Sequence, residues 1–130
     1  MAALSDSPAL GHITTFGGHP VCCAAGFAAM EALLDSDLMT KVKVKEALFK
    51  KLLVHHAIKQ VRSFGLMLAV EFDSFATCKK IISNCIINGV VTDWFLFAEN
   101  CLRIAPPLII TEDEIRQACG VIIEAIDKSL

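Results

Sequence analysis

The apolar residues of this chain switch between helical and strand spacing, and this switch constrains the fold more than any other sequence feature. Residues 38–56 carry an apolar stripe at helical spacing, which is typical of an amphipathic helix. We interpret the lysines of this segment as its solvated face: Lys41, Lys43, Lys45, Lys50 and Lys51. In residues 66–72 the strongly apolar side chains recur at every second position, which predicts a strand.

Helix-start signals place four helices along the chain. Residues that suit the start of a helix are Pro20, Ser36 or Asp37, Asp73-Ser74, and Thr111 with its capping-box partner Glu114. The first helix is predicted at residues 20–34, and its many small residues lead us to expect that it is buried against another backbone. The second is predicted to end at residue 56, the third at Asn88-Gly89, and the fourth follows residue 111.

Strand signals fill the gaps between these helices. Strands are predicted at residues 61–72, 90–92 and 101–104. Gly65 marks a bulge or a tight bend just before residues 66–72, Pro106-Pro107 ends the last strand, and residues 93–100 are predicted to be a connection. This order indicates an α+β fold, in which helices cover a small, mostly antiparallel sheet.

Composition and charge exclude several classes of function. The 130 residues suffice for one domain with a core. Their net charge of -2 comes with no basic stripe, so we expect no nucleic-acid partner. No apolar run approaches the ~18 residues of a membrane helix, so we expect no membrane association. Hydrophobic residues make up 55% of the chain, an excess that predicts surface covered by another chain or domain.

The cysteines lie within apolar patterns. None of the six belongs to a Cys-x-x-Cys pair or has the spacing of a zinc site. We therefore interpret them as reduced, small apolar residues and predict no metal. Reduced cysteines favour a cytoplasmic location.

The stretch GHITTFGGHPVCCAAG, residues 11–26, has the composition of a tight turn that leads into a helix. Gly17-Gly18 permit backbone angles that are closed to other residues, and the free N–H groups of a helix start suit an anion. The Thr15 hydroxyl is placed to donate a hydrogen bond to a phosphate oxygen. A purely structural turn is the alternative interpretation of Thr15.

Arg103 is the sharpest single candidate for binding. It lies between Leu102 and Ile104, and strand alternation sends these two side chains to the face opposite Arg103. A guanidinium binds a carboxylate through two parallel hydrogen bonds, so Arg103 is a candidate carboxylate clamp. The alternative is an ordinary solvent-facing arginine on a strand.

Three segments, TTFGGHPVCCAAG at residues 14–26, VRSFGLMLAVEF at 61–72 and LRIAPPLIITEDEI at 102–115, resemble class III (fold-type I) pyridoxal-phosphate aminotransferases. This family includes the acetylornithine, ornithine and 4-aminobutyrate aminotransferases. The segments occur in the family's order and span nearly the whole chain. The resemblance implies the C-terminal small domain of that fold, at residues 20–130, preceded at 1–19 by a lead-in and a cofactor-phosphate loop.

The resemblance also implies roles for single residues. Arg103, in the context R-I-A-P-P-L, matches the arginine that holds the substrate carboxylate. Thr15, before F-G-G, matches the threonine that reaches the cofactor phosphate of the neighbouring subunit in a homodimer. The family often has Asn where this chain has His19. The implied substrates are an amino or ω-amino donor and a 2-oxo acid, and the implied cofactor is pyridoxal 5'-phosphate.

The residues that perform the chemistry in this family lie upstream of the matched segments. Transamination needs a lysine that bonds to pyridoxal phosphate and an aspartate that pairs with its pyridine nitrogen. No lysine here occupies a matching position, so we assign no catalytic residue and expect the chain to be inactive alone. The resemblance covers only the end of such an enzyme, so Met1 can be an internal methionine. A non-catalytic α+β ligand-binding or dimerisation module, or a gene remnant, is the alternative.

Overall fold

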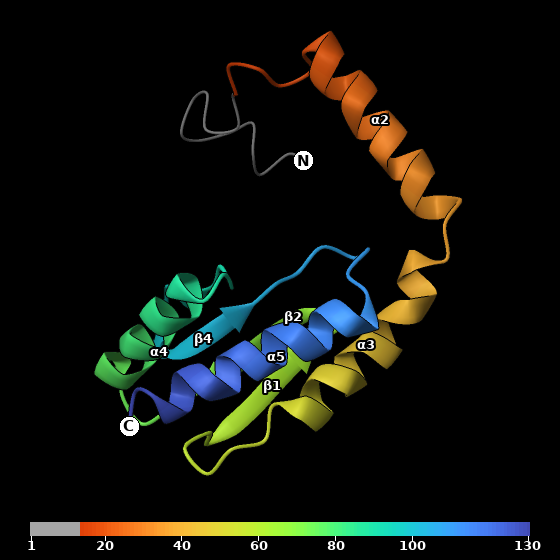
Figure 1. The fold of residues 1–130 in the computed structure, drawn as a ribbon. Helices are drawn as coiled ribbons and strands as arrows, with labels where there is room; N and C mark the ends of the chain where they lie inside the picture. The colour runs from red at the N-terminus through yellow and green to blue at the C-terminus, as the bar shows by residue number, and fades with distance from the viewer. Residues whose placement is uncertain (1–13) are drawn as a thin grey trace. The chain divides into compact units, whose positions relative to one another are not determined.

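The computed structural model describes residues 14–130. The chain divides into two compact units, Met1–Asp37 and Leu38–Leu130, and each is described by itself (Figure 1). Most of the predicted lead-in therefore lies outside the described residues. The division at residues 1–19 and 20–130 stays a prediction.

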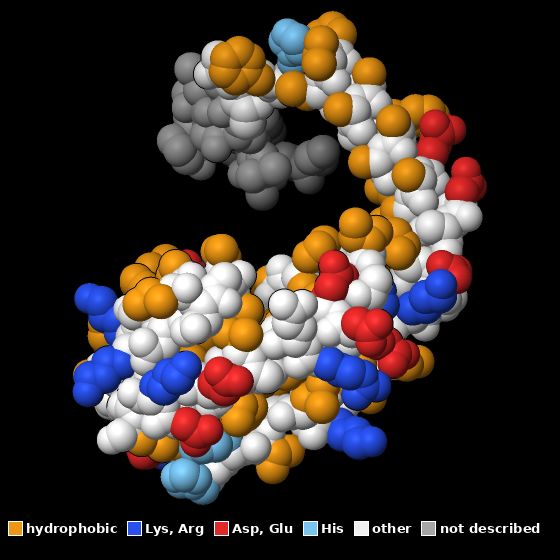
Figure 2. Space-filling view, viewed as in Figure 1, with side chains coloured by type: hydrophobic (Ala, Val, Ile, Leu, Met, Phe, Trp, Pro, Cys, Tyr) orange, Lys and Arg blue, Asp and Glu red, His pale blue; other side chains and the backbone are white. Residues whose placement is uncertain are grey.

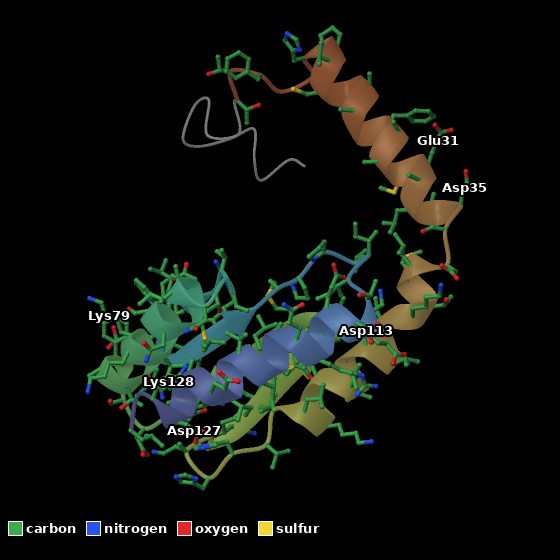
Figure 3. All side chains as sticks on the ribbon, in the orientation of Figure 1. Glu31, Asp35, Lys79, Asp113, Asp127 and Lys128 are labelled. Carbon is green, nitrogen blue, oxygen red and sulfur yellow. The ribbon has the colours of Figure 1, made fainter. Side chains whose placement is uncertain are left out.

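The described part of the first unit is a turn followed by helix α2, Pro20–Leu34. The helix has the predicted bounds, with Pro20 at its start. None of its residues is buried within the chain itself, so the expected burial against another backbone stays a prediction. Its apolar side chains surround the axis instead of forming one face, and hydrophobic side chains cover it in Figure 2. Its acidic residues Glu31 and Asp35 lie together at its C-terminal end (Figure 3).

The second unit begins with helix α3, Leu38–Leu52, which is shorter than predicted. Helical spacing does not continue to residue 56, because His55 makes a turn of its own there. Its Nδ1 accepts the N–H of Ala57 at 3.1 Å, and its Nε2 lies 3.0 Å from a carboxylate oxygen of Asp127. These contacts fix the loop that follows the helix to the C-terminal end of the chain.

The sheet of the second unit has four strands in the order β1-β2-β4-β3, and all of its neighbouring pairs are antiparallel. The strands are β1 Gln60–Phe64, β2 Met67–Glu71, β3 Asp93–Phe95 and β4 Ala98–Ile104. Gly65 is the turn of a β1–β2 hairpin, with a φ of 61° that favours glycine. This sheet confirms the α+β prediction.

The second hairpin differs from the prediction. Residues 90–92 form no strand, and the predicted connection at 93–100 contains β3 and the first part of β4. Trp94 pairs across the strands with Leu102, and its ring packs against Phe75 with centroids 5.4 Å apart. Aromatic side chains favour strands because they pack well across a pleated surface, and this packing places the strand at 93–95.

Helix α4, Phe75–Ile87, and helix α5, Glu112–Asp127, begin at the predicted caps. The Ser74 side chain accepts the N–H of Thr77 at 3.2 Å. In the capping box, Thr111 Oγ1 accepts the N–H of Glu114 at 3.2 Å, while a Glu114 carboxylate oxygen accepts the N–H of Thr111 at 2.7 Å. The bond from the Thr111 N–H lowers the pKa of the Glu114 carboxyl.

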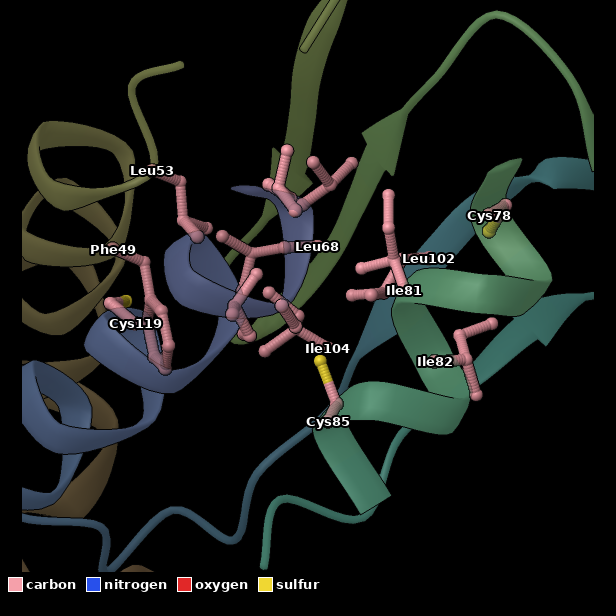
Figure 4. Packing of buried hydrophobic residues seen from close by; sticks show 14 of the residues in the cluster. Phe49, Leu53, Leu68, Cys78, Ile81, Ile82, Cys85, Leu102, Ile104 and Cys119 are labelled. Carbon is pink, nitrogen blue, oxygen red and sulfur yellow. The ribbon is translucent and has the colours of Figure 1, made fainter. Parts of the chain in front are cut away.

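Helices α3, α4 and α5 lie on one face of the sheet (Figure 1), and the core lies between them and the strands (Figure 4). Phe49, Cys85 and Ile122 enter it from the three helices, and Leu68 and Leu102 enter it from the strands. One sequence interpretation is wrong here, because Lys45 is buried rather than solvated. On α4, Ile81 is buried in the core and Ile86 is exposed.

The cysteines separate into two groups. Cys22 and Cys23 are exposed, while the others are buried: Cys78, Cys85, Cys101 and Cys119. Burial raises the pKa of Cys78 and Cys119 to about 12 and that of Cys85 to about 11.

We expect iodoacetamide to label Cys22 and Cys23 first, with the buried thiols reacting only after unfolding, because the thiolate is the nucleophile. Peptide mass spectrometry measures the order. Because their folded-state pKa is raised, these thiols contribute to the free energy of unfolding at a pH below their unfolded pKa of 9.0. This contribution is lost as the pH rises toward 12. Rapid labelling of Cys119 in the folded chain would contradict the core described above.

Candidate functional site

The candidate carboxylate site lies on the face of the sheet opposite the helices. Cross-strand pairing places Arg62, Ala69, Arg103 and Asp93 in one row over all four strands. Leu102 and Ile104, on either side of Arg103, are buried in the core. Strand alternation therefore directs Arg103 outward, as the sequence predicted.

Arg103 is half-exposed and pairs with a carboxylate of the same sheet. One terminal nitrogen, Nη2, lies 3.3 Å from Oδ2 of Asp93. The side chains of Arg103 and Asp93 are 45% and 50% exposed, so this is a surface ion pair and not a core one. Exposed ion pairs are weak, so the guanidinium can still bind a further carboxylate.

Arg103 lines a hollow of about 270 Å³ together with the core residues Phe49 and Ile122, and it lines two further hollows. One, of about 310 Å³, is lined by Arg103, Asp93, Thr92, Val91 and Ala105. The other, of about 450 Å³, is lined by Arg103, Arg62, Ala69 and the β3–β4 turn from Phe95 to Ala98. The small side chain of Ala69 leaves space between the two arginines. The hollow of about 450 Å³ therefore combines a cationic group with an apolar wall.

Arg62 is the other cation of this hollow, and sequence reasoning assigned it no role. Its Nη1 forms an ion pair with Glu71 and donates to Oε1 of Gln60 at 2.9 Å, while Nη2 lies 3.2 Å from Sγ of Cys101. The hydrogen bond to Glu71 raises the pKa of Arg62. These partners occupy the Arg62 fork, so Arg103 is the better placed of the two to bind a new anion.

Lys45 holds the loop that follows Arg103. Its Nζ donates to the backbone oxygen of Leu108 at 2.6 Å, and its side chain is buried. Pro106 and Pro107 stiffen the same loop, since proline fixes its own φ. The loop that limits one side of the site is thus fixed by α3 and by its own prolines.

Thr15 belongs to the first unit, in a turn that ends at helix α2. His19 caps this helix, with Nδ1 accepting the N–H of Val21 at 3.3 Å. Asn is among the residues most favoured at such a cap, because its side chain accepts a backbone N–H. The His19 side chain accepts the N–H of Val21 in the same way, which gives a physical reason why His can stand in its place. Gly18 has a φ of 77°, and a Cβ added to Gly17 would lie 2.2 Å from Oγ1 of Thr14. The φ of Gly18 favours glycine, whereas a side chain at Gly17 would require the Thr14 hydroxyl to move. The Thr15 side chain is exposed.

The surroundings of the lysines differ from those of a lysine that binds a cofactor. They begin at position 41, and most lie on α3 and α4. Lys59 pairs with Asp73 at 2.5 Å, and Lys128 with Glu124 at 3.7 Å.

Across residues 14–130, no three His, Cys, Asp or Glu side chains group together as metal ligands would. In the same range, every helix is too short or too polar to span a membrane.

The chain also matches a known protein family. The family described as "Aminotransferase class-III" matches residues 2–126, nearly the whole chain. The chain belongs to this family. Among class-III aminotransferases, the acetylornithine aminotransferase of Haemophilus ducreyi is 32% identical over 117 residues, which cover 90% of this chain and 29% of that relative. Ornithine aminotransferase 2 of Staphylococcus aureus strain N315 is 35% identical over 109 residues, which cover 80% and 26%.

A segment of a solved aminotransferase has the same fold as this chain. The ornithine aminotransferase of Toxoplasma gondii, crystallised in the presence of oxidised glutathione, matches with a TM-score of 0.79 and 30% identity. The match covers 98% of this chain and 30% of that one. The chain therefore spans less than a third of the length of these relatives, and its fold is that of the corresponding aminotransferase segment.

Proposed function

We propose that this chain supplies the substrate-carboxylate site of a pyridoxal-phosphate-dependent aminotransferase, and that Arg103 binds that carboxylate. The whole enzyme would transfer an amino group from an amino or ω-amino donor to a 2-oxo acid. The observation that carries the proposal is the outward, half-exposed Arg103 beside a hollow of about 450 Å³. Membership of the class-III aminotransferase family supports this interpretation of the site over an ordinary surface arginine.

We further propose that Thr15 contacts the cofactor phosphate. When bound, pyridoxal phosphate supplies the electron sink of transamination. The turn before α2 fits the phosphate end, because it presents an exposed hydroxyl next to Gly17 and Gly18, and helix starts attract anions. The lysine that holds the cofactor in this family has no counterpart in the chain. Residues 1–19 would form this cofactor loop and residues 20–130 the small domain.

We propose a cytoplasmic homodimer in which Thr15 serves the site of the neighbouring subunit. The exposed apolar surface of α2 supports burial against a further domain or chain. The alternative function, a non-catalytic ligand-binding or dimerisation module, has less support. The match to the aminotransferase family covers residues 2–126, almost the whole chain, and no feature of the described residues favours the module.

A chimera tests the proposal. This chain would replace the matching segment of the Haemophilus ducreyi acetylornithine aminotransferase, and the chain alone would serve as the control. We expect the chimera to bind pyridoxal phosphate, seen in its visible absorbance, and to transaminate. We expect the chain alone to do neither, because it has no lysine at the family's position.

Two outcomes would contradict the proposal. A chimera that folds, by circular dichroism, and binds the cofactor but never transaminates would favour a remnant that has lost its role. Turnover by the chain alone would show that the missing lysine is not needed.

A further inference from the structure

We propose that Asp93 is a positioning residue for Arg103, which holds one edge of the guanidinium so that its remaining N–H groups face the hollow over Ala69. A substrate carboxylate then approaches from the Ala69 side and not from the Asp93 side. This inference rests on the proposed function of Arg103 and specifies the direction from which its ligand arrives.

The carboxylate of Asp93 is itself held in place. Oδ1 accepts the backbone N–H of Trp94 at 2.8 Å, while Oδ2 faces Nη2 of Arg103 at 3.3 Å. An acid that is bonded through both oxygens has little freedom to rotate. Asp93 can therefore hold the guanidinium in an orientation that is set by the position of its own strand.

The two residues also share a fixed backbone frame. Asp93 and Arg103 are direct partners in the β3–β4 register. Beside them, Oγ1 of Thr92 donates to the backbone oxygen of Arg103 at 2.5 Å. These contacts keep the start of β3 against β4, so the distance between the carboxylate and the guanidinium does not depend on a mobile loop.

Two of the hollows beside Arg103 differ in the charge that they present. The hollow of about 310 Å³ contains Asp93, whose negative charge repels a second carboxylate. The hollow of about 450 Å³ contains Arg62, which is paired with Glu71, and has no acidic side chain in its own lining. An anionic ligand is therefore favoured on the Ala69 side.

The opposite role for Asp93 is competition, in which it occupies Arg103 until a substrate displaces it. The two roles predict opposite effects. A positioning residue that is removed leaves Arg103 disordered and weakens carboxylate binding, whereas a competitor that is removed strengthens it. An asparagine side chain keeps an oxygen that can accept from Nη2, so Asp93→Asn should retain most of a positioning effect.

The experiment uses NMR spectroscopy of the full 130-residue chain. The Arg103 side-chain N–H signals, assigned by their loss in Arg103→Lys, report how freely the guanidinium rotates. We expect Asp93→Ala to average these signals and Asp93→Asn to restore their separation. Backbone amide shifts of β3 and β4 check that the hairpin is intact. The matched control is Glu112→Ala, which removes the exposed partner of Arg116 and should leave Arg103 unchanged.

A titration with succinate, and with succinamide as the uncharged control, then tests the site. We expect Asp93→Ala to weaken succinate binding about five-fold, the size of one lost hydrogen bond. Arg103 signals that are unchanged in Asp93→Ala, or succinate binding that becomes tighter, would overturn the positioning role. Equal succinate binding by Arg103→Lys and the unaltered chain would instead overturn the proposed function. The NMR result on whether Asp93 orders the Arg103 side chain would not be affected.

Discussion

Phe49→Ala is expected to lower the free energy of unfolding by about 3–5 kcal/mol, the usual cost of removing a buried aromatic ring. Phe49 is 1% exposed and lies in the core cluster, where α3 packs on α5. Alanine would leave a cavity that the surrounding helices and strands can fill only in part. Urea unfolding followed by circular dichroism measures the change.

The control for this variant is Phe97→Ala. Phe97 is 97% exposed at the tip of the β3–β4 hairpin, so the same chemical change removes no core contact. We expect its effect on the unfolding free energy to be within about 0.5 kcal/mol. Equal losses for the two variants would show that Phe49 does not lie in a packed core.

Arg103→Ala, made in the chimera, is expected to raise KM for carboxylate substrates by about 10- to 150-fold. Hydrogen bonds to charged groups contribute about 1.5–3 kcal/mol, and the fold-change follows from that range. Because the guanidinium binds the substrate carboxylate in the ground state as well as in the transition state, we expect kcat to change less than KM. Steady-state kinetics with the donor varied measures both.

Arg116→Ala is the matched control. Arg116 forms an exposed ion pair with Glu112 on α5, away from the Arg103 hollows, so its removal should leave KM unchanged. Arg103→Lys keeps the charge but loses the planar fork, and we expect an intermediate KM. If the kinetics of Arg103→Ala match those of the unaltered chimera, Arg103 does not bind the substrate.

Local signals were sufficient to predict much of the fold. The capping box of Thr111 and Glu114 depends on two residues that are three positions apart. The turn at Gly65 depends on the positive φ that a single glycine can adopt. The outward direction of Arg103 followed from its two apolar neighbours. Each of these features is decided by residues close together in the sequence.

Features decided by distant residues were missed. Lys45 is buried because the backbone oxygen that it binds belongs to Leu108, 63 positions away in the chain. The pairing of Asp93 with Arg103 depends on a tight hairpin whose register has an irregularity between Trp94 and Phe95, which the sequence does not reveal. The predicted strand at 90–92 failed for a related reason, since Val90 donates its N–H to Cys85 at the end of α4. Helix termination takes precedence there over strand propensity.

The strand order has a consequence for how the domain folds. Each hairpin, β1–β2 and β3–β4, can form from residues close in sequence, but the sheet is complete only when Val70 meets Leu102 across the intervening helix α4. Closing that long loop costs chain entropy before any contact compensates for it. We therefore expect the joining of the two hairpins to be the slow step of folding, and until it occurs the apolar face of each hairpin is exposed to aggregation.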